Sequence, residues 1–167
     1  ASLNDNTVAW YENGLSAFGD PTFGSATITT SADAANTVYA VDIDSDGDMD
    51  VLSASSNDDK IAWYESDGAA DPSFTARTIS TSADGAYSVY AADIDNDGDM
   101  DVLSASVFDD KIAWYESDGA ADPSFTAVNI ATSADGAVSV YAADIDNDGD
   151  IDVLSASFND DKIAWYE

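Results

Sequence analysis

The nine residues Asp144–Asp152, whose sequence is DIDNDGDID, set the pattern for the rest of the chain. Related sequences occur at Asp42–Asp50 (DIDSDGDMD) and Asp93–Asp101 (DIDNDGDMD), so the pattern returns after 51 residues each time. Acidic residues stand at positions 1, 3, 5, 7 and 9 of each copy, and position 6 is a glycine that permits a sharp turn. Carboxylates so close together repel one another unless a cation lies among them. Because Ca²⁺ accepts six to eight oxygen ligands in flexible geometry, each copy predicts a calcium site.

The spacing within each copy indicates which groups would bind the ion. We expect side-chain oxygens from positions 1, 3, 5 and 9, and the backbone carbonyl from position 7. An EF-hand would need a bidentate Glu at position 12, where the copies have Ser53, Ser104 and Ser155. A solvated acidic turn is the alternative for a single copy, and three copies in fixed register make it the weaker interpretation.

The composition is that of an acidic protein with enough apolar residues to fold. The chain has 167 residues, 45% of them hydrophobic, which suffices for one domain with a core. There are 34 acidic residues, 4 basic ones and no histidine, giving a net charge of -30. Nucleic acids and anionic membrane surfaces require basic patches, so we expect neither as a partner. No apolar stretch approaches about 18 residues, so we also expect no membrane insertion.

Three further features bear on where the protein works. Cysteine is absent, so the sequence contains no disulfide framework. Calcium sites of this open kind work best at millimolar calcium, so we expect a secreted or cell-surface protein. The chain begins at Ala1 with no initiator Met and no leader, which predicts a mature product or a segment of something longer.

The repeat extends beyond the acidic segments. The sequence KIAWYE ends at Glu65, Glu116 and Glu167, and a looser version, TVAWYE, spans Thr7–Glu12. A period of 51 residues is typical of propeller blades and not of helical repeats. We divide the chain into a partial blade at 1–31, full blades at 32–82 and 83–133, and a partial blade at 134–167.

Each period predicts four short strands. In the second full repeat we expect them at Ser88–Ala92, Asp101–Ser106, Lys111–Glu116 and within Thr126–Thr132, separated by turns that contain Asp, Gly and Pro. Val, Ile, Tyr and Trp favour strands, and no segment has a convincing 3.6-residue apolar period. The sequence therefore predicts an all-β fold of four-stranded antiparallel β-propeller blades, with about three 51-residue repeats in the chain.

The order of a strand, a DxDxDGxxD loop and a DVLSAS strand resembles the FG-GAP or VCBS repeats of integrin-like calcium-binding β-propellers, over almost the whole chain. In that family the acidic loop joins the first two strands of a blade and binds calcium. The chain has Gly85-Ala86 where integrins have Phe-Gly, and Ser104-Ala105-Ser106 in place of Gly-Ala-Pro. It is therefore more similar to the bacterial VCBS type, and no integrin-like ligand site follows.

The resemblance implies three calcium sites with five ligand residues each, of which the position-7 residue acts through its carbonyl. The residues are Asp42, Asp44, Asp46, Asp48 and Asp50; Asp93, Asp95, Asp97, Asp99 and Asp101; and Asp144, Asp146, Asp148, Asp150 and Asp152.

One tryptophan stands at the same place in each predicted third strand: Trp10, Trp63, Trp114 and Trp165. A flat aromatic on a propeller rim would stack on sugar rings, as in the lectin-like proteins that the chain resembles. Large aromatics also dominate core burial, so we favour packing between blades over ligand binding for these residues.

Paired acids precede the same strand, at Asp58-Asp59, Asp109-Asp110 and Asp160-Asp161. Adjacent carboxylates point apart and cannot flank a bond as glycosidase pairs do, so we predict hairpin turns there. The chain also has no His, Cys or Gly-rich phosphate loop, which leaves acid–base or nucleophilic catalysis few candidates. We expect no enzymatic activity.

Two hypotheses of different kinds remain for the function. The first is an extracellular module for binding or adhesion, with a neutral glycan or a protein as ligand, since the acidic surface disfavours anionic partners. The second is a structural or assembly repeat in which calcium only holds the fold together. A third, weaker hypothesis is the non-catalytic part of a larger polysaccharide-active protein.

Three repeats are too few for a closed propeller, which needs about four to eight blades. An open row would leave strand edges unpaired. We therefore expect a homodimer that closes a six-bladed ring, unless the chain is a piece of a larger propeller. The two versions of the third strand, TVAWYE and KIAWYE, would compete at each junction.

Overall fold

A computed structural model describes residues 1–2, 4–14 and 22–167 of the chain. The described residues form antiparallel β-sheets and no helix, so the predicted all-β class is confirmed. Accordingly, this part of the chain contains no helix with the length and apolar character that a membrane span requires.

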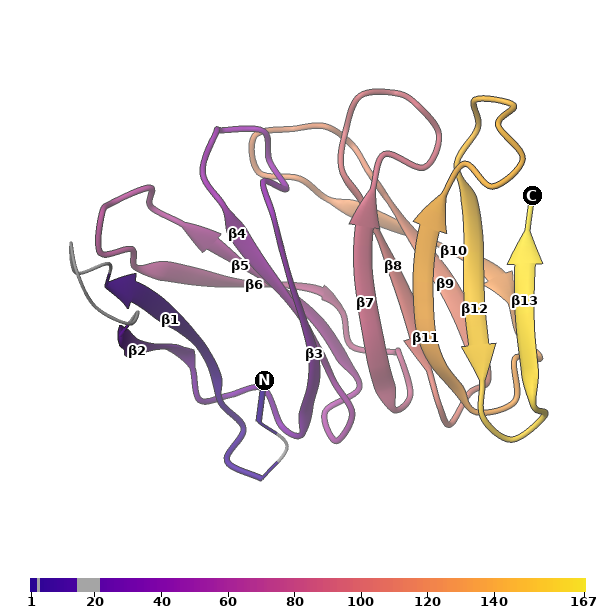
Figure 1. Cartoon of the computed structure of the whole chain (residues 1–167), viewed down its shortest axis with the longest axis horizontal. Helices are drawn as coiled ribbons and strands as arrows, with labels where there is room; N and C mark the ends of the chain where they lie inside the picture. Colours follow the sequence, from indigo (N-terminus) through magenta and orange to yellow (C-terminus); the bar gives the residue numbers. More distant parts are fainter. Residues whose placement is uncertain (3, 15–21) are drawn as a thin grey trace.

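The strands lie in four sheets that follow one another along the chain (Figure 1). The first sheet pairs β1 (Val8–Gly14) with β2 (Thr22–Thr29). The second contains β3 (Ala35–Val41), β4 (Asp50–Ser55), β5 (Lys60–Ser66) and β6 (Phe74–Ser80). The third contains β7 (Ala86–Ala92), β8 (Asp101–Ser106), β9 (Lys111–Ser117) and β10 (Phe125–Ala131). The last contains β11 (Ala137–Ala143), β12 (Asp152–Ser157) and β13 (Lys162–Tyr166).

Within the described residues the sheets stand in a row and do not close into a ring (Figure 1). Strand β7 lies beside β3 on one side and beside β11 on the other, so the first strands of the three larger sheets are neighbours. Tyr39, Tyr90 and Tyr141 take the same place on these strands, and their ring centroids are 4.8 and 4.6 Å apart. A row of aromatic rings, tilted by 49° and 46° to one another, thus connects the three larger sheets along their first strands.

The middle strands are buried on both faces because neighbouring sheets cover them. All six residues of β8 are buried, whereas β10 is exposed over most of its length. Leu52, Ile61 and Trp63 of the β3–β6 sheet belong to a core that is shared with β7, β8 and β9. Strands covered on both faces show little alternation of apolar and polar residues, which explains runs such as IAWY.

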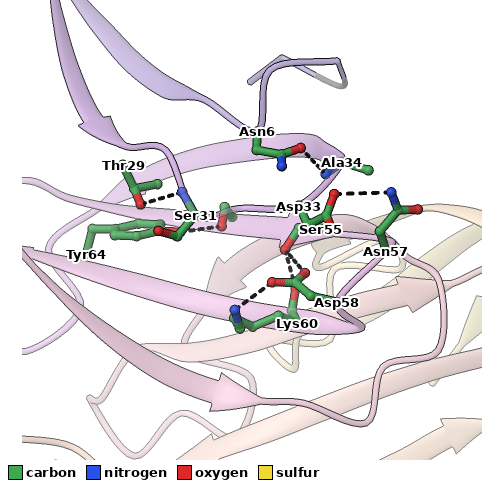
Figure 2. Close-up of polar contacts among 11 residues, drawn as sticks. Asn6, Thr29, Ser31, Asp33, Ala34, Ser55, Asn57, Asp58, Lys60 and Tyr64 are labelled. Carbon is green, nitrogen blue, oxygen red and sulfur yellow. Dashed lines mark hydrogen bonds and ion pairs between the residues drawn. The ribbon is translucent and has the colours of Figure 1, made fainter.

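The acid pairs lie in hairpin turns, as predicted. Asp58 accepts hydrogen bonds from Ser55 Oγ at 2.6 Å and from Lys60 Nζ at 2.5 Å, both within its own hairpin (Figure 2). Asp59 has a φ of 55°, and its Oδ1 accepts a hydrogen bond from the N–H of Gly85 in the next repeat at 2.9 Å. The first acid of a pair therefore closes the hairpin, and the second attaches it to the following repeat.

Candidate metal centres

The three acidic loops connect β3 to β4, β7 to β8 and β11 to β12, and all three lie along the same edge of the molecule (Figure 1). A side chain holds each turn; in the second loop the N–H of Gly98 donates to Asp93 Oδ2 at 3.0 Å. Gly47, Gly98 and Gly149 have φ values of 100°, 100° and 102°. Residues with a side chain rarely adopt this conformation, so the loop backbone requires the glycine at position 6.

Carboxylate oxygens converge in each loop, where three of them lie within 4.8 Å of one another. Positions 1 and 3 contribute in every copy, and the third member is position 9 in the first and third copies and position 5 in the second. Asp46 stays outside the first cluster, and Asp101 stays outside the second. The clusters are Asp42, Asp44 and Asp50; Asp93, Asp95 and Asp97; and Asp144, Asp146 and Asp152.

Two oxygens in these clusters are buried without a hydrogen-bond partner. Asp93 Oδ1 and Asp144 Oδ1 have none among the residues that the structure describes. The equivalent oxygen of Asp42 accepts the N–H of Asp46 at 3.1 Å. A buried carboxylate oxygen without a partner is unfavourable unless a cation or a water molecule meets it. The residues present therefore fit a hard divalent cation such as Ca²⁺, which prefers oxygen ligands.

The position-9 residues also hold the loops onto the sheets. Asp50 is 1% exposed, and it accepts the N–H of Ile43 at 3.1 Å with Oδ2 and that of Ser66 at 2.8 Å with Oδ1. Burial raises the pKa of Asp50 above its ordinary value, and the two N–H donors oppose this increase. The pKa of Asp101 is raised by burial in the same way. Each carboxylate oxygen has a second lone pair, so this anchoring leaves capacity for a cation.

The position-7 side chains point away from the clusters. A Cβ added to Gly68 or Gly119 would lie 1.9 Å from Oδ2 of Asp48 or Asp99, respectively. The two glycines have φ values of 64° and 63°, and their lack of a side chain makes room for these carboxylates. Asp150 of the third copy is exposed. Binding of an ion by the backbone carbonyl at position 7 stays a prediction.

Glu167 is a further carboxylate near the third acidic loop, and the spacing of the acidic residues did not predict it. It lies with Asp146 and Asp148 in a further group whose oxygens are within 4.8 Å of one another. Its counterpart Glu65 is instead paired with Arg77, whose guanidinium nitrogen is 2.7 Å from a carboxylate oxygen. The signal in the sequence is the Glu that ends each KIAWYE. Its approach to the acidic loop depends on how the third strand packs, which spacing alone does not reveal.

The four tryptophans differ in their exposure. Trp63 is 1% exposed, and the guanidinium carbon of Arg77 lies 5.3 Å from the centre of its ring. Trp10 and Trp114 are half-buried, and Trp165 is 48% exposed. Burial supports the packing interpretation for Trp63, since no ligand reaches a side chain so enclosed. Ligand binding by the other three remains a prediction.

A family model described as FG-GAP-like repeat matches residues 42–104 and 101–155, which together contain all three acidic loops. No curated protein matches the chain. The family match thus covers the two full four-stranded sheets for the most part and continues into the last sheet.

Proposed function

The chain belongs to the FG-GAP-like repeat family. We propose that it is an extracellular, calcium-binding, β-propeller-like module for binding or adhesion. The repeats provide a scaffold of similar sheets, and the acidic loops provide the calcium sites. The calcium sites support the fold, while a separate surface recognises the ligand.

The observation that carries the calcium proposal is the pair of buried oxygens without partners, Asp93 Oδ1 and Asp144 Oδ1. Calcium held by these loops would neutralise the repulsion among clustered carboxylates. It would also fix the end of one strand relative to the start of the next, because the ligand residues span both.

We expect about three Ca²⁺ ions per chain by isothermal titration calorimetry. With a dissociation constant on the order of 10⁻⁴ M, millimolar Ca²⁺ adds about 1.4 kcal/mol of stability per site. Chelation should therefore lower the melting temperature by many degrees. The variant Asp146→Ala should bind one ion fewer and keep the other two sites, because each loop forms its own cluster.

Asp84→Asn is the matched control for this experiment. Asp84 is exposed just before the start of β7, whereas the acidic loop follows the end of that strand. The substitution removes one negative charge without touching a loop, so the calcium count should not change. A wild-type melting curve that does not move on chelation would contradict the calcium proposal.

The location and the ligand class rest on charge and on calcium supply. Open carboxylate sites fill at the millimolar calcium found outside cells, which supports an extracellular module. A net charge of -30 favours neutral or cationic ligands, and a neutral glycan is the class we propose. Tight binding to heparin-like polymers in calcium-free buffer would contradict this electrostatic argument.

We propose no enzymatic activity, because the sequence has no His or Cys and its acid pairs serve as turns.

One observation favours a second function, the assembly of chains. In the described part of the chain the last sheet has three strands and the first has two, whereas the two sheets between them have four each. We propose that two chains join through these incomplete sheets and close a ring of about six blades. Light scattering at micromolar concentration tests this proposal, and a stable, soluble monomer would refute it.

A further inference from the structure

A cavity of about 460 Å³ lies where the β3–β6 sheet meets the β7–β10 sheet. Its lining comes from the starts of β3 and β7, from the hairpin turns after β4 and β8, and from Asn4 before β1. The acidic loops follow the other ends of β3 and β7 (Figure 1), so the cavity and the candidate calcium sites are at opposite ends of the sheets. Its volume is in the range of sites for small ligands, about 300–1,000 Å³.

The residues at the positions that line the cavity differ between repeats, although the second strand of each larger sheet has the same sequence. Strands β4, β8 and β12 share the sequence DVLSAS. The turn that follows is Ser56-Asn57, Val107-Phe108 or Phe158-Asn159, and the second residue of β3, β7 or β11 is Asn36, Tyr87 or Val138. Because one backbone accepts such different side chains, folding does not dictate their identity. Variable loop residues on a repeated scaffold are typical of a recognition surface.

Two aromatic rings stand in the apolar part of the wall, beside Ala34 and Val107. Tyr87 is 43% exposed and Phe108 is 70% exposed. The ring of Phe108 lies against Gly85, where an added Cβ would be 2.6 Å from its Cδ2. An exposed ring held in position by the backbone offers a flat apolar face, which suits the C–H face of a sugar ring.

Asn36 and Asn57 belong to the polar part, together with Asn4 and Ser56, and hydrogen bonds to the protein fix the orientation of Asn36 and Asn57. Asn36 Nδ2 donates to the carbonyl oxygens of Ala34 and Ala86 at 3.1 Å each, which bridges the two sheets. Asn57 Nδ2 donates to Asp33 Oδ1 at 3.2 Å (Figure 2). Neither amide oxygen accepts a hydrogen bond from any residue in the described part of the chain. Both are therefore available to the hydroxyl groups of a ligand.

We propose that this cavity binds one ring of an uncharged glycan, stacked on Tyr87 and Phe108, with hydroxyl groups donating to the amide oxygens of Asn36 and Asn57. The inference rests on the proposed binding function and assigns its ligand site to this cavity instead of to the tryptophans. Fixed amide oxygens beside exposed rings match a ligand with many hydroxyl donors, which favours a sugar over a peptide. The net charge of -30 disfavours sialylated and sulfated sugars.

The test is a ¹⁵N NMR titration of the full chain in calcium-containing buffer. Glucose, galactose, mannose and N-acetylglucosamine serve as probes, and we expect at least one to shift the side-chain amide signals of Asn36 and Asn57. The double variant Tyr87→Val/Phe108→Asn should bind that sugar about tenfold more weakly, because both stacking faces are gone. The third repeat has Val and Asn at these positions, so the fold accommodates both substitutions.

Phe158→Val is the matched control, since it removes a 77% exposed ring outside this cavity and introduces the residue that the second repeat has there. It should leave the affinity unchanged. If none of the four sugars shifts the two amide signals, or if the double variant binds as well as wild type, the inference is wrong. A cationic hexapeptide that shifts these signals where no sugar does would overturn it as well. The calcium titration is read separately, so a failure of the calcium proposal is distinguishable from a failure of this one.

Discussion

Asp118, in the loop after β9, shows how a few hydrogen bonds set the chemistry of a single carboxylate. Its Oδ2 accepts the hydroxyl of Ser124 at 2.5 Å, and its Oδ1 accepts the N–H groups of Ser124 and Ala120 at 3.1 and 3.2 Å. These bonds, the serine hydroxyl foremost, lower the pKa of Asp118. Asp67 and Ser73 form the same arrangement one repeat earlier, and the pKa of Asp67 is lowered for the same reason.

The variant Ser124→Ala should have a higher Asp118 pKa, closer to the ordinary value, because the largest cause of the lowering is removed. A lowered carboxyl pKa stabilises the fold above the pKa of the unfolded chain, and this stabilisation is lost as the pH falls through the folded-state pKa. The difference in stability between wild type and variant should therefore fade below about pH 4. A ¹³C NMR titration of the carboxyl carbons measures the shift directly.

Asp67 serves as a control within the same molecule, because its own serine is untouched. Its pKa should be the same in wild type and in the Ser124→Ala variant. An unchanged Asp118 pKa in a folded variant would show that the serine hydroxyl does not control this carboxylate.

The sequence predicted which loops would gather carboxylates, but not which three oxygens meet in each. Positions 1 and 3 converge in every copy, as their spacing around the turn requires. The choice between positions 5 and 9 does not follow from the hydrogen bonds either. Asp46 and Asp97 both accept the N–H of the position-7 residue at 2.9 Å, although only Asp97 belongs to its cluster. Asp50 and Asp101 both accept two backbone N–H groups, although only Asp50 belongs to its cluster.

At the scale of elements, the hairpin turns join each sheet to the next. Asp110 has a φ of 56°, and its Oδ1 accepts the N–H of Gly136 at 2.9 Å. Its carbonyl oxygen also accepts the N–H of Ala134 at 2.9 Å. Asn6 does the same for Ala34 at the first junction, with an N–O distance of 3.1 Å. An oxygen at this side-chain position therefore holds the start of the following repeat, whether it comes from Asp or from Asn.

Asp110→Ala should destabilise the chain by about 1–2 kcal/mol, since it removes the acceptor of a partly buried N–H. Asp110→Asn should stay within about 0.5 kcal/mol of wild type, because Asn keeps the acceptor and tolerates a positive φ. Urea unfolding gives both values.

Asp161 provides the control for backbone strain in this experiment. It has a φ of 53° in the last hairpin turn, and among the described residues its side chain forms no hydrogen bond to a following repeat. Asp161→Ala therefore measures the effect of alanine at a positive φ alone. If it destabilises as much as Asp110→Ala, the bond to Gly136 contributes nothing.

The strands were largely predictable, while the cavity was not. Strand β8 has the predicted bounds, Asp101–Ser106, because an acidic loop precedes it and turn residues follow it. Strand β7 begins at Ala86, two residues before its predicted start at Ser88. Its pairing with β8 shifts register between Ala86 and Ser88, and the strand extends across this irregularity. The cavity joins Asn36 to Tyr87, which are adjacent only after two sheets pack. A pattern within one repeat cannot reveal a surface made by two.

At the scale of the whole molecule, both ends of the row of sheets are exposed. Ile163 on β13 is 78% exposed, whereas its counterparts Ile61 and Ile112 are 0% exposed. At the other end Tyr11 on β1 is 63% exposed, whereas Tyr64 on β5 is 4% exposed. Apolar side chains that are buried at internal positions and exposed at the two ends are typical of association surfaces.

Ring closure by two chains would bring β1 of one copy to the edge of β12 of the other. Strand β13 already pairs with β12 there, and the hydroxyl groups of Tyr166 and Ser155 are hydrogen-bonded at 3.1 Å. Tyr64 makes the same contact with Ser53 at 3.2 Å, and Tyr11 of a second copy would take the equivalent place. In the proposed dimer the two strands would compete for one position, so one of them would have to leave it, and we propose that this strand is β13.

Deleting residues 162–167 should therefore strengthen the proposed dimer, because it frees the edge of β12. Tyr11→Ser should weaken it, because burial of a large side chain contributes about 1.5–3 kcal/mol, which corresponds to a dissociation constant at least about tenfold higher. Light scattering coupled to size-exclusion chromatography, over a series of concentrations, gives both constants. Tyr87→Ser is the control, since it removes a 43% exposed tyrosine from a middle sheet. If deletion of β13 raises the dissociation constant of the dimer, or if Tyr11→Ser leaves it unchanged, strand replacement is not the mode of association.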